Sequence, residues 1–166
     1  MTTFDSRVRL LLVLGVVLLL LVGVAAAIPA QPTLVVERVD TGDRIVETPV
    51  SNGTVVGLEY THSVEKSRVY DEYTIRGDRL VNTRMEFESY GWGLPADANV
   101  TRENGTFVYD PPGELRRLTV KPGTVANHTL IVGEDRYDLV GLSAGESVHI
   151  HVEQESALTD WLGGLV

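Results

Sequence analysis

The chain has 166 residues, with 23 acidic residues, 14 basic residues and no cysteine. Without cysteine it can form no disulfide framework, thiolate zinc site or cysteine nucleophile. Removing Arg7, Arg9 and Asp5 from these totals leaves 12 basic and 22 acidic residues from Gln31 onward, a formal charge of −10. A surface of that sign argues against nucleic acid as a partner and against attraction to anionic lipid headgroups.

The first element along the chain is an uncharged apolar run, residues 10–28, with the sequence LLLVLGVVLLLLVGVAAAI. Its 19 residues approach the ~20 that cross a bilayer as a helix. Because Arg7 and Arg9 precede it, the positive-inside rule predicts residues 1–9 in the cytoplasm and the rest of the chain outside. The alternative is a cleaved signal peptide, since Ala25-Ala26-Ala27 offers an A-x-A site. The run exceeds the ~7–15 apolar residues of a signal peptide, which favours a single-pass membrane anchor.

Four of the five asparagines open an N-x-T sequon, the acceptor sequence for N-glycosylation. With ordinary Ser and Thr usage, a random asparagine has about a one-in-ten chance of that context. Asn-Gly and Thr are also turn and strand-start residues, so both readings place these sites in exposed loops. We predict glycosylation of an exported domain at Asn52, Asn99, Asn104 and Asn127.

After a short stiff tether, residues 29–32, the chain reads as β segments separated by Gly, Asn, Asp and Pro. The expected strands are Thr33–Val39, Arg44–Thr48, Thr54–Tyr60, Val69–Arg76, Arg79–Glu88, Thr106–Tyr109, Leu115–Val120, Thr129–Val132, Arg136–Val140 and Ser147–Glu153. Gly77-Asp78 separates two strong strands and predicts a tight hairpin. The even spacing predicts an all-β fold over residues 33–166, an antiparallel sandwich or barrel-like domain of about ten short strands, preceded by one N-terminal transmembrane helix. A short C-terminal helix is expected over Ser156–Val166.

Two stretches carry recognisable motifs, Tyr60-Thr-His-Ser-Val-Glu-Lys66 and Phe87-Glu-Ser-Tyr-Gly-Trp-Gly-Leu-Pro95. Together they resemble the family called domain of unknown function 1850, whose pattern runs His-Ser-Val-Glu, a Glu-x-Tyr-type pair and Phe-x-Ser-x-Gly-x-Gly-Leu-Pro. The residues that fit position by position are His62, Ser63, Val64, Glu65, Phe87, Ser89, Gly91, Gly93, Leu94 and Pro95. Glu72 and Tyr73 fit more loosely, and Ser67-Arg68 stands where the family commonly has Thr-Pro.

The resemblance implies a small exported protein, of a kind often encoded beside tripartite transporters of the TAXI type. It therefore implies an accessory role in solute uptake, and it implies no known chemistry.

We expect the two motifs to converge into a site for a ligand or a protein partner. Glycines let a backbone approach a ligand closely, and an aromatic side chain supplies a flat apolar wall. The residues of this expected site are His62, Ser63, Glu65, Glu72, Tyr73, Ser89, Gly91, Trp92, Gly93 and Pro95. The alternative is that His62 and Ser63 hydrogen-bond a turn and the glycines only supply positive φ angles.

His149 and His151 form a His-x-His spacing that metal sites use, and His62 could add a third nitrogen. In an alternating strand they share the outer face with Glu153, and two histidines on a solvated strand face are commonplace. We therefore predict no metal and no cofactor.

The predicted function is a membrane-anchored extracytoplasmic accessory domain without catalytic residues. It would bind a transporter permease, a solute-binding protein or a solute. One alternative is a glycosylated structural module of the cell surface. Another is a small hydrolase that uses His62 with Glu65 or Glu72. Ser63-Val-Glu-Lys66 matches S-x-x-K by letter, but it follows a strand and has no Ser-Asp-Asn partner, so a serine acyl-enzyme is excluded.

Lysine is scarce, with only Lys66 and Lys121, and this acidic composition is typical of a protein adapted to molar salt. We expect the domain to lose folded structure on dilution from about 2 M to about 0.05 M KCl, because self-repulsion is then no longer screened. Far-UV circular dichroism measures this loss. An ordinary acidic domain from a GC-rich genome would stay folded in both buffers.

Overall fold

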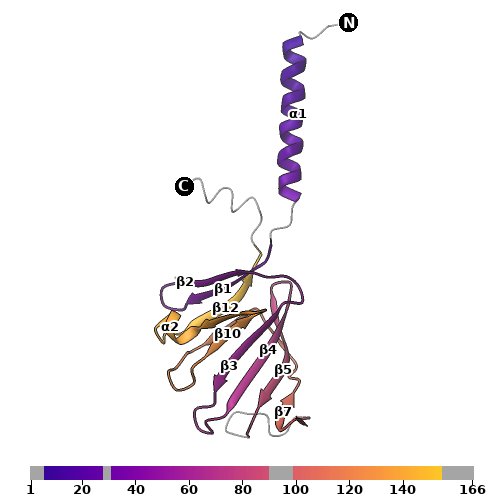
Figure 1. Ribbon diagram of the computed structural model, residues 1–166. Helices are drawn as coiled ribbons and strands as arrows, with labels where there is room; N and C mark the ends of the chain where they lie inside the picture. Colours follow the sequence, from indigo (N-terminus) through magenta and orange to yellow (C-terminus); the bar gives the residue numbers. More distant parts are fainter. Residues whose placement is uncertain (1–5, 28–30, 90–98, 155–166) are drawn as a thin grey trace. The chain divides into compact units, whose positions relative to one another are not determined.

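The computed structural model describes residues 6–27, 31–89 and 99–154 (Figure 1). The chain divides into two compact units, residues 1–31 with 154–166 and residues Pro32–Glu153. In the first unit α1 is one continuous helix over Ser6–Ala27. Within the described residues no helix meets the length and hydropathy required of a membrane span. The C-terminal helix predicted over Ser156–Val166 lies outside the described residues.

The second unit consists of two antiparallel sheets (Figure 1). The smaller sheet has the order β2-β1-β12-β9. Its strands are β1 (Thr33–Arg38), β2 (Arg44–Pro49), β9 (Arg117–Val120) and β12 (Val148–Glu153). The larger sheet has the order β11-β10-β3-β4-β5-β7-β6, and β8 pairs with β5. Its strands are β3 (Val55–Thr61), β4 (Arg68–Arg76), β5 (Arg79–Phe87), β6 (Thr101–Glu103), β7 (Thr106–Tyr109), β8 (Glu114–Leu115), β10 (Thr129–Val132) and β11 (Asp135–Asp138). The prediction of a mostly β, sandwich-like fold is confirmed.

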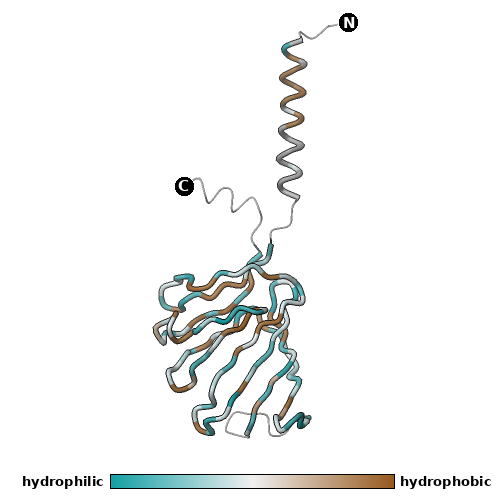
Figure 2. The backbone as a smooth tube through the Cα atoms, in the orientation of Figure 1, coloured by the Kyte–Doolittle hydropathy of each residue, from teal (hydrophilic) through white to brown (hydrophobic). Residues whose placement is uncertain are grey.

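The core lies between the two sheets and follows the period of two along each strand. Alternate residues such as Val56 and Leu58 of β3 are at most 5% exposed, and Leu34 and Val36 of β1 are fully buried. Hydrophobic and hydrophilic positions alternate along the strands in Figure 2. Burial of these residues from both sheets in one cluster is the main stabilising term of the domain.

Most predicted strands agree with the structure to within one residue, but two segments differ. The segment predicted as one strand over Leu115–Val120 divides into β8 and β9, which pair in different sheets. The strand predicted over Arg136–Val140 ends at Asp138, and the five-residue helix α2 (Leu139–Ser143) follows. The Asp138 carboxylate accepts from the backbone N–H groups of Val140 and Gly141 at 3.0 and 3.1 Å. With its carboxylate on these N–H groups, Asp138 caps the start of a helical turn in a segment whose residues favour β structure.

Two tight hairpins form where the sequence predicted turns. At Gly77-Asp78 the flanking residues Arg76 and Arg79 pair directly, and Gly77 has a φ of 61°. At Asn104-Gly105 the φ angles are 50° and 94°, and the turn joins β6 to β7, a strand pair whose first member was not predicted. Positive φ at both central residues is the requirement of a type I′ hairpin, which Asn-Gly satisfies.

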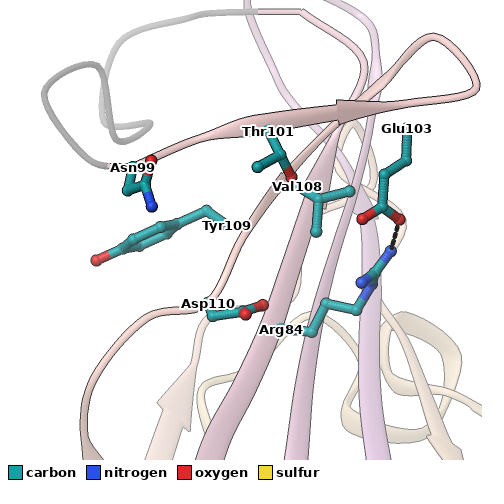
Figure 3. A pocket seen from close by; sticks show the side chains of 7 residues that line it. All are labelled: Arg84, Asn99, Thr101, Glu103, Val108, Tyr109 and Asp110. Carbon is teal, nitrogen blue, oxygen red and sulfur yellow. Dashed lines mark hydrogen bonds and ion pairs between the residues drawn. The ribbon is translucent and has the colours of Figure 1, made fainter.

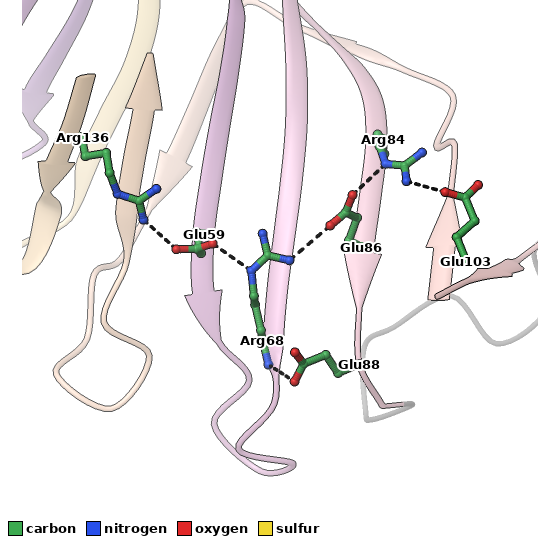
Figure 4. A network of polar contacts seen from close by, with 7 residues as sticks. All are labelled: Glu59, Arg68, Arg84, Glu86, Glu88, Glu103 and Arg136. Carbon is green, nitrogen blue, oxygen red and sulfur yellow. Dashed lines mark hydrogen bonds and ion pairs between the residues drawn. The ribbon is translucent and has the colours of Figure 1, made fainter. Parts of the chain in front are cut away.

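The outer face of the larger sheet carries a ladder of alternating charges, whose members come from five of its strands (Figure 4). Arg68 and Arg84 each lie between two carboxylates, Arg136 at one end contacts Glu59, and the contacts measure 2.7–3.2 Å. From β11 across to β6 the order is Arg136, Glu59, Arg68, Glu86, Arg84 and Glu103. Arg68 is the central member, since its guanidinium contacts Glu59 at 2.8 Å and Glu86 at 3.2 Å.

We predict that Arg68→Met lowers the free energy of unfolding by about 1 kcal/mol or less at pH 7, because partly exposed pairs contribute little individually. Hydrogen bonds from Arg68 and Arg136 lower the pKa of Glu59 against the opposing effect of burial. A carboxylate with a lowered folded-state pKa stabilises the fold above its ordinary pKa, 4.5 here, and loses that contribution as pH falls through the lowered value. The difference in unfolding free energy between Arg68→Met and the wild type should therefore become smaller in acid.

Urea unfolding at pH 7 and at about pH 3 measures that difference. Arg116→Met is the matched control, because the Arg116 side chain is 69% exposed and forms an ion pair with Asp78, outside the ladder. An equal deficit for both variants at both pH values would contradict a specific role for the ladder.

Candidate functional site

The first motif forms the loop between β3 and β4, residues 62–67. The N–H of His62 donates to the carbonyl of Ser67 at 2.8 Å, which closes the loop, and the N–H of Lys66 donates to the carbonyl of His62 at 2.9 Å. The half-buried His62 imidazole accepts from the N–H of Glu65 through Nδ1 at 3.2 Å. Lys66 takes a positive φ of 55°, which lets so short a connection return to β4. His62 thus fixes the conformation of its own loop through both backbone and side chain.

The tip of this loop is exposed and apolar at its centre. Ser63, Val64 and Glu65 are all exposed, and Val64 has a relative exposure of 65%. Because hydrogen bonds on either side hold the loop, the valine is presented on a defined backbone. Such an arrangement suits contact with another protein surface.

The second motif begins at the end of β5, next to the residues that follow the first motif. Phe87 pairs with Val69 across the β4–β5 ladder. Beyond it the hydroxyls of Ser67 and Ser89 lie 2.8 Å apart, and the N–H of Arg68 donates to the Glu88 carboxylate at 3.3 Å. These contacts link the residues that directly follow the first motif to the start of the second. The predicted site residues Gly91, Trp92, Gly93 and Pro95 lie outside the described residues.

Glu72 and Tyr73 do not belong to this region, and the prediction that grouped them with His62 is corrected. They are four and five residues beyond Arg68 on β4, roughly 13–17 Å at ~3.3 Å per residue. Tyr73 is 5% exposed and packs in the core. Glu72 points to the opposite face, where its carboxylate accepts from the Thr83 hydroxyl at 3.0 Å. The extended geometry of β4 carries both side chains away from the loop.

A polar pair that the sequence analysis missed lies on the inner face of the larger sheet. Tyr60 and Asp71 are diagonal neighbours across β3 and β4, and the Tyr60 hydroxyl donates to the Asp71 carboxylate. The residues directly opposite Asp71 are Leu58 and Met85, both apolar. Burial raises the pKa of Asp71 to about 6, against the opposing effect of the Tyr60 hydrogen bond. The sequence signal was present, since Asp71 occupies the same alternation phase as the buried Val69 and Tyr73.

Burial and the nearby Asp71 carboxylate also raise the pKa values of two phenols, Tyr60 and Tyr73. Burial and the Asp71 charge raise the pKa of Tyr60 well above its ordinary value. Burial, with a smaller contribution from Asp71, raises the pKa of Tyr73 to about 12. Both phenols therefore stay protonated and can only donate to, or lie against, the carboxylate.

Tyr60 also attaches the loop between β9 and β10 to this part of the sheet. The rings of Tyr60 and His128 stack at 5.1 Å with 20° between their planes, and the N–H of Thr61 donates to the carbonyl of Ala126 at 2.7 Å. Burial lowers the pKa of His128, and its Nδ1 is enclosed without a hydrogen-bond partner among the described residues. The imidazole is therefore neutral at pH 7 and provides no positive charge to Asp71.

The family model of DUF1850, a domain of unknown function, matches residues 56–139, just over half of the chain. The chain belongs to the DUF1850 family. The match runs from the second residue of β3 to the first residue of α2, so it contains both motifs and the Tyr60–Asp71 pair. No curated protein and no solved structure gives a significant match to the chain.

The histidines of this DUF1850 protein form no metal site within the described residues. His149 Nδ1 lies 3.0 Å from the Thr119 hydroxyl, and His151 Nε2 lies 3.0 Å from the Glu153 carboxylate. His151 is 9% exposed, so the expectation of a solvated histidine is wrong; it lies on a central strand, opposite the fully buried Val35. Across residues 6–27, 31–89 and 99–154, no three His, Asp or Glu residues are placed to hold a metal ion.

The four sequon asparagines are all exposed, as both readings of the sequence require. Asn99 lies at a shallow pocket of about 200 Å³ (Figure 3). The residues that line it are Arg84, Asn99, Thr101, Glu103, Val108, Tyr109 and Asp110. The 2.8 Å pair between Arg84 and Glu103 bounds it, and the Tyr109 ring lies beside Asn99 (Figure 3). Because Asn99 and Thr101 belong to one sequon, this pocket adjoins a predicted glycan and not the loop of the first motif.

We predict that Asp71→Asn stabilises the DUF1850 domain at pH 8 and not in acid. The folded-state pKa of Asp71 is raised from 3.8 to about 6, so the folded state gains stability from the bound proton at low pH and loses it as pH rises through 6. At ~1.36 kcal/mol per pKa unit the loss is roughly 3 kcal/mol when the carboxyl is fully ionised. Asparagine cannot ionise, so the variant should gain up to that amount at pH 8 and nothing at pH 4.

Urea unfolding at pH 4, 6 and 8 checks this expectation. Glu72→Gln is the matched control on the same strand and the opposite face. A constant difference between Asp71→Asn and the wild type at all three pH values would show that Asp71 does not titrate with folding.

Proposed function

We propose that this DUF1850 protein is a membrane-anchored extracytoplasmic accessory domain that docks a component of a solute transporter through the β3–β4 loop. The observation that carries the proposal is the exposed Val64 on a loop held by hydrogen bonds to His62. A preordered loop loses little conformational entropy on binding, so more of its contact energy appears as affinity.

The anchor and the outside location are supported by the sequence. Residues 10–28 are uncharged and apolar, with Arg7 and Arg9 ahead of them, and four exposed sequons follow. The charge of −10 from Gln31 onward opposes attraction to anionic headgroups and favours a protein as the docking partner. The association of the family with TAXI-type tripartite transporters points to a permease or a solute-binding protein.

The second candidate function is a glycosylated structural module of the cell surface. It is favoured by one observation, the bond from the Glu65 N–H to His62 Nδ1, which gives His62 a role in the fold. The hydrolase alternative has less support, because the Glu72 side chain faces Thr83 on the middle of β4 while His62 lies in the loop.

We predict that Val64→Ser abolishes capture of the transporter component without changing thermal stability, since an exposed valine makes a contact only with the partner. The experiment is a pull-down from native membranes with the tagged full-length chain, read by mass spectrometry. The His62→Ala/Glu65→Ala variant, which removes the bond from the Glu65 N–H to the His62 imidazole, should also lose the partner.

Val39→Ser is the matched control, because Val39 follows β1 in the other sheet and is 41% exposed. Equal recovery of the permease or binding protein by all four chains would overturn the proposal. Unfolding of His62→Ala/Glu65→Ala, with no effect of Val64→Ser on capture, would favour the structural module.

A further inference from the structure

We propose that the pocket beside β6 and β7 seats the first sugar of an N-linked glycan on Asn99, with the Tyr109 ring as its apolar wall. The site takes one pyranose ring that is covalently attached to the protein. It rests on the predicted glycosylation of Asn99 and goes beyond the partner docking proposed above. The glycan thereby becomes part of the packing of the β6–β7 hairpin.

The first argument is that Asn99 differs from the other sequon asparagines. Asn104 and Asn127 take positive φ angles of 50° and 52°, and the Asn52 side chain accepts from the Gly77 N–H at 2.6 Å. These are roles that turns give to asparagine. The Asn99 side chain makes no hydrogen bond to the described residues and lines a pocket instead. The use of asparagine in turns therefore accounts for three of the sequons and not for the one at the pocket.

The second argument is the direction in which a sugar would leave Asn99. Thr101 pairs with Val108, and the same register continued by two residues sets Asn99 opposite Asp110 on one face of the sheet. The Tyr109 ring lies beside Asn99, and the Asn99 amide points toward that ring (Figure 3). A sugar bonded to the amide nitrogen therefore begins against the aromatic ring and extends over the pocket.

The third argument is the chemistry of the lining. The hydroxyl groups of a sugar both donate and accept hydrogen bonds. The pocket offers acceptors in the carboxylates of Glu103 and Asp110 and donors in the Arg84 guanidinium. The 2.8 Å pair between Arg84 and Glu103 holds one side of it in place. The Tyr109 ring supplies the flat apolar surface that the C–H face of a pyranose requires.

The size of the pocket selects one attached sugar. Its volume of about 200 Å³ is below the ~300–1,000 Å³ of pockets that enclose drug-sized ligands. A shallow site of this size holds a free monosaccharide only weakly. Attachment to Asn99 gives the sugar an effective concentration of about millimolar or more, so that the same weak contacts are occupied.

The test uses the full-length chain purified from its native membranes. Thr101→Val, Thr106→Val and Thr129→Val each remove one sequon by a residue of similar shape at a strand position, and they leave the asparagine in place. Mass spectrometry measures glycan occupancy, and thermal unfolding measures Tm. We expect a glycan on Asn99 and a Tm about 2–4 °C lower for Thr101→Val, with smaller changes for the other two valine variants.

Two further variants separate loss of the glycan from the change at residue 101. Thr101→Ser keeps the sequon, so it should retain both the glycan and the Tm of the wild type. Asn99→Gln removes the same sequon at its other end, so it should lower Tm as Thr101→Val does.

Tyr109→Leu then tests the wall of the pocket. Loss of the ring should lower Tm more in the glycosylated chain than in the Thr101→Val background, where the contact with the sugar is already absent. An unmodified Asn99, equal Tm changes for the three valine variants, or additive effects of Tyr109→Leu and Thr101→Val would overturn the proposal. Failure here leaves the pull-down result at Val64 unaffected, because Val64 lies in the β3–β4 loop and the pocket lies beside β6 and β7.

Discussion

The antiparallel pairing of β3 with β4 is the constraint on which the rest of the domain depends. Its register places Glu59 and Arg68 on one face and Tyr60 and Asp71 on the other, and its end forms the 62–67 loop. Gly57 permits this pairing, because an added Cβ there would lie 2.4 Å from Cε2 of Tyr70. The Tyr70 ring occupies that space and lies under the Arg68 guanidinium at 5.2 Å. A shift of one residue would exchange the two faces and disrupt both charge arrangements.

The two faces of this strand pair handle charge in opposite ways. On the outer face every arginine of the ladder contacts a carboxylate, in a solvated setting where each pair contributes little and salt screens it. On the inner face one carboxylate faces apolar neighbours with a single phenol as donor. A contribution to stability is enough to explain the paired charges of the outer face. It does not explain Asp71 on the inner face, because burial disfavours the ionised carboxylate. Costly groups of this kind concentrate at functional sites.

The described parts of the DUF1850 motifs hold the loop, and Asp71 lies apart from them on the inner face. His62, Ser67 and Ser89 take part in hydrogen bonds that hold the β3–β4 connection to the end of β5. Tyr60 is the link between the two regions, since it donates to Asp71, stacks on His128 and lies two residues before His62.

The sequence by itself determined most of the strands, the hairpin at Gly77-Asp78 and the family, because alternation, turn residues and motifs are local properties of the chain. The sequence also predicted that His62 and Glu65 converge with residues 91–95, which lie outside the described residues, so this stays a prediction. Only the tertiary structure decided that Glu72 and Tyr73 lie away from the His62 loop, that Asp138 caps a helix, and that Leu58 and Met85 lie opposite Asp71. These outcomes depend on which strand lies opposite each residue, and strand partners distant in sequence are set by packing of the whole sheet.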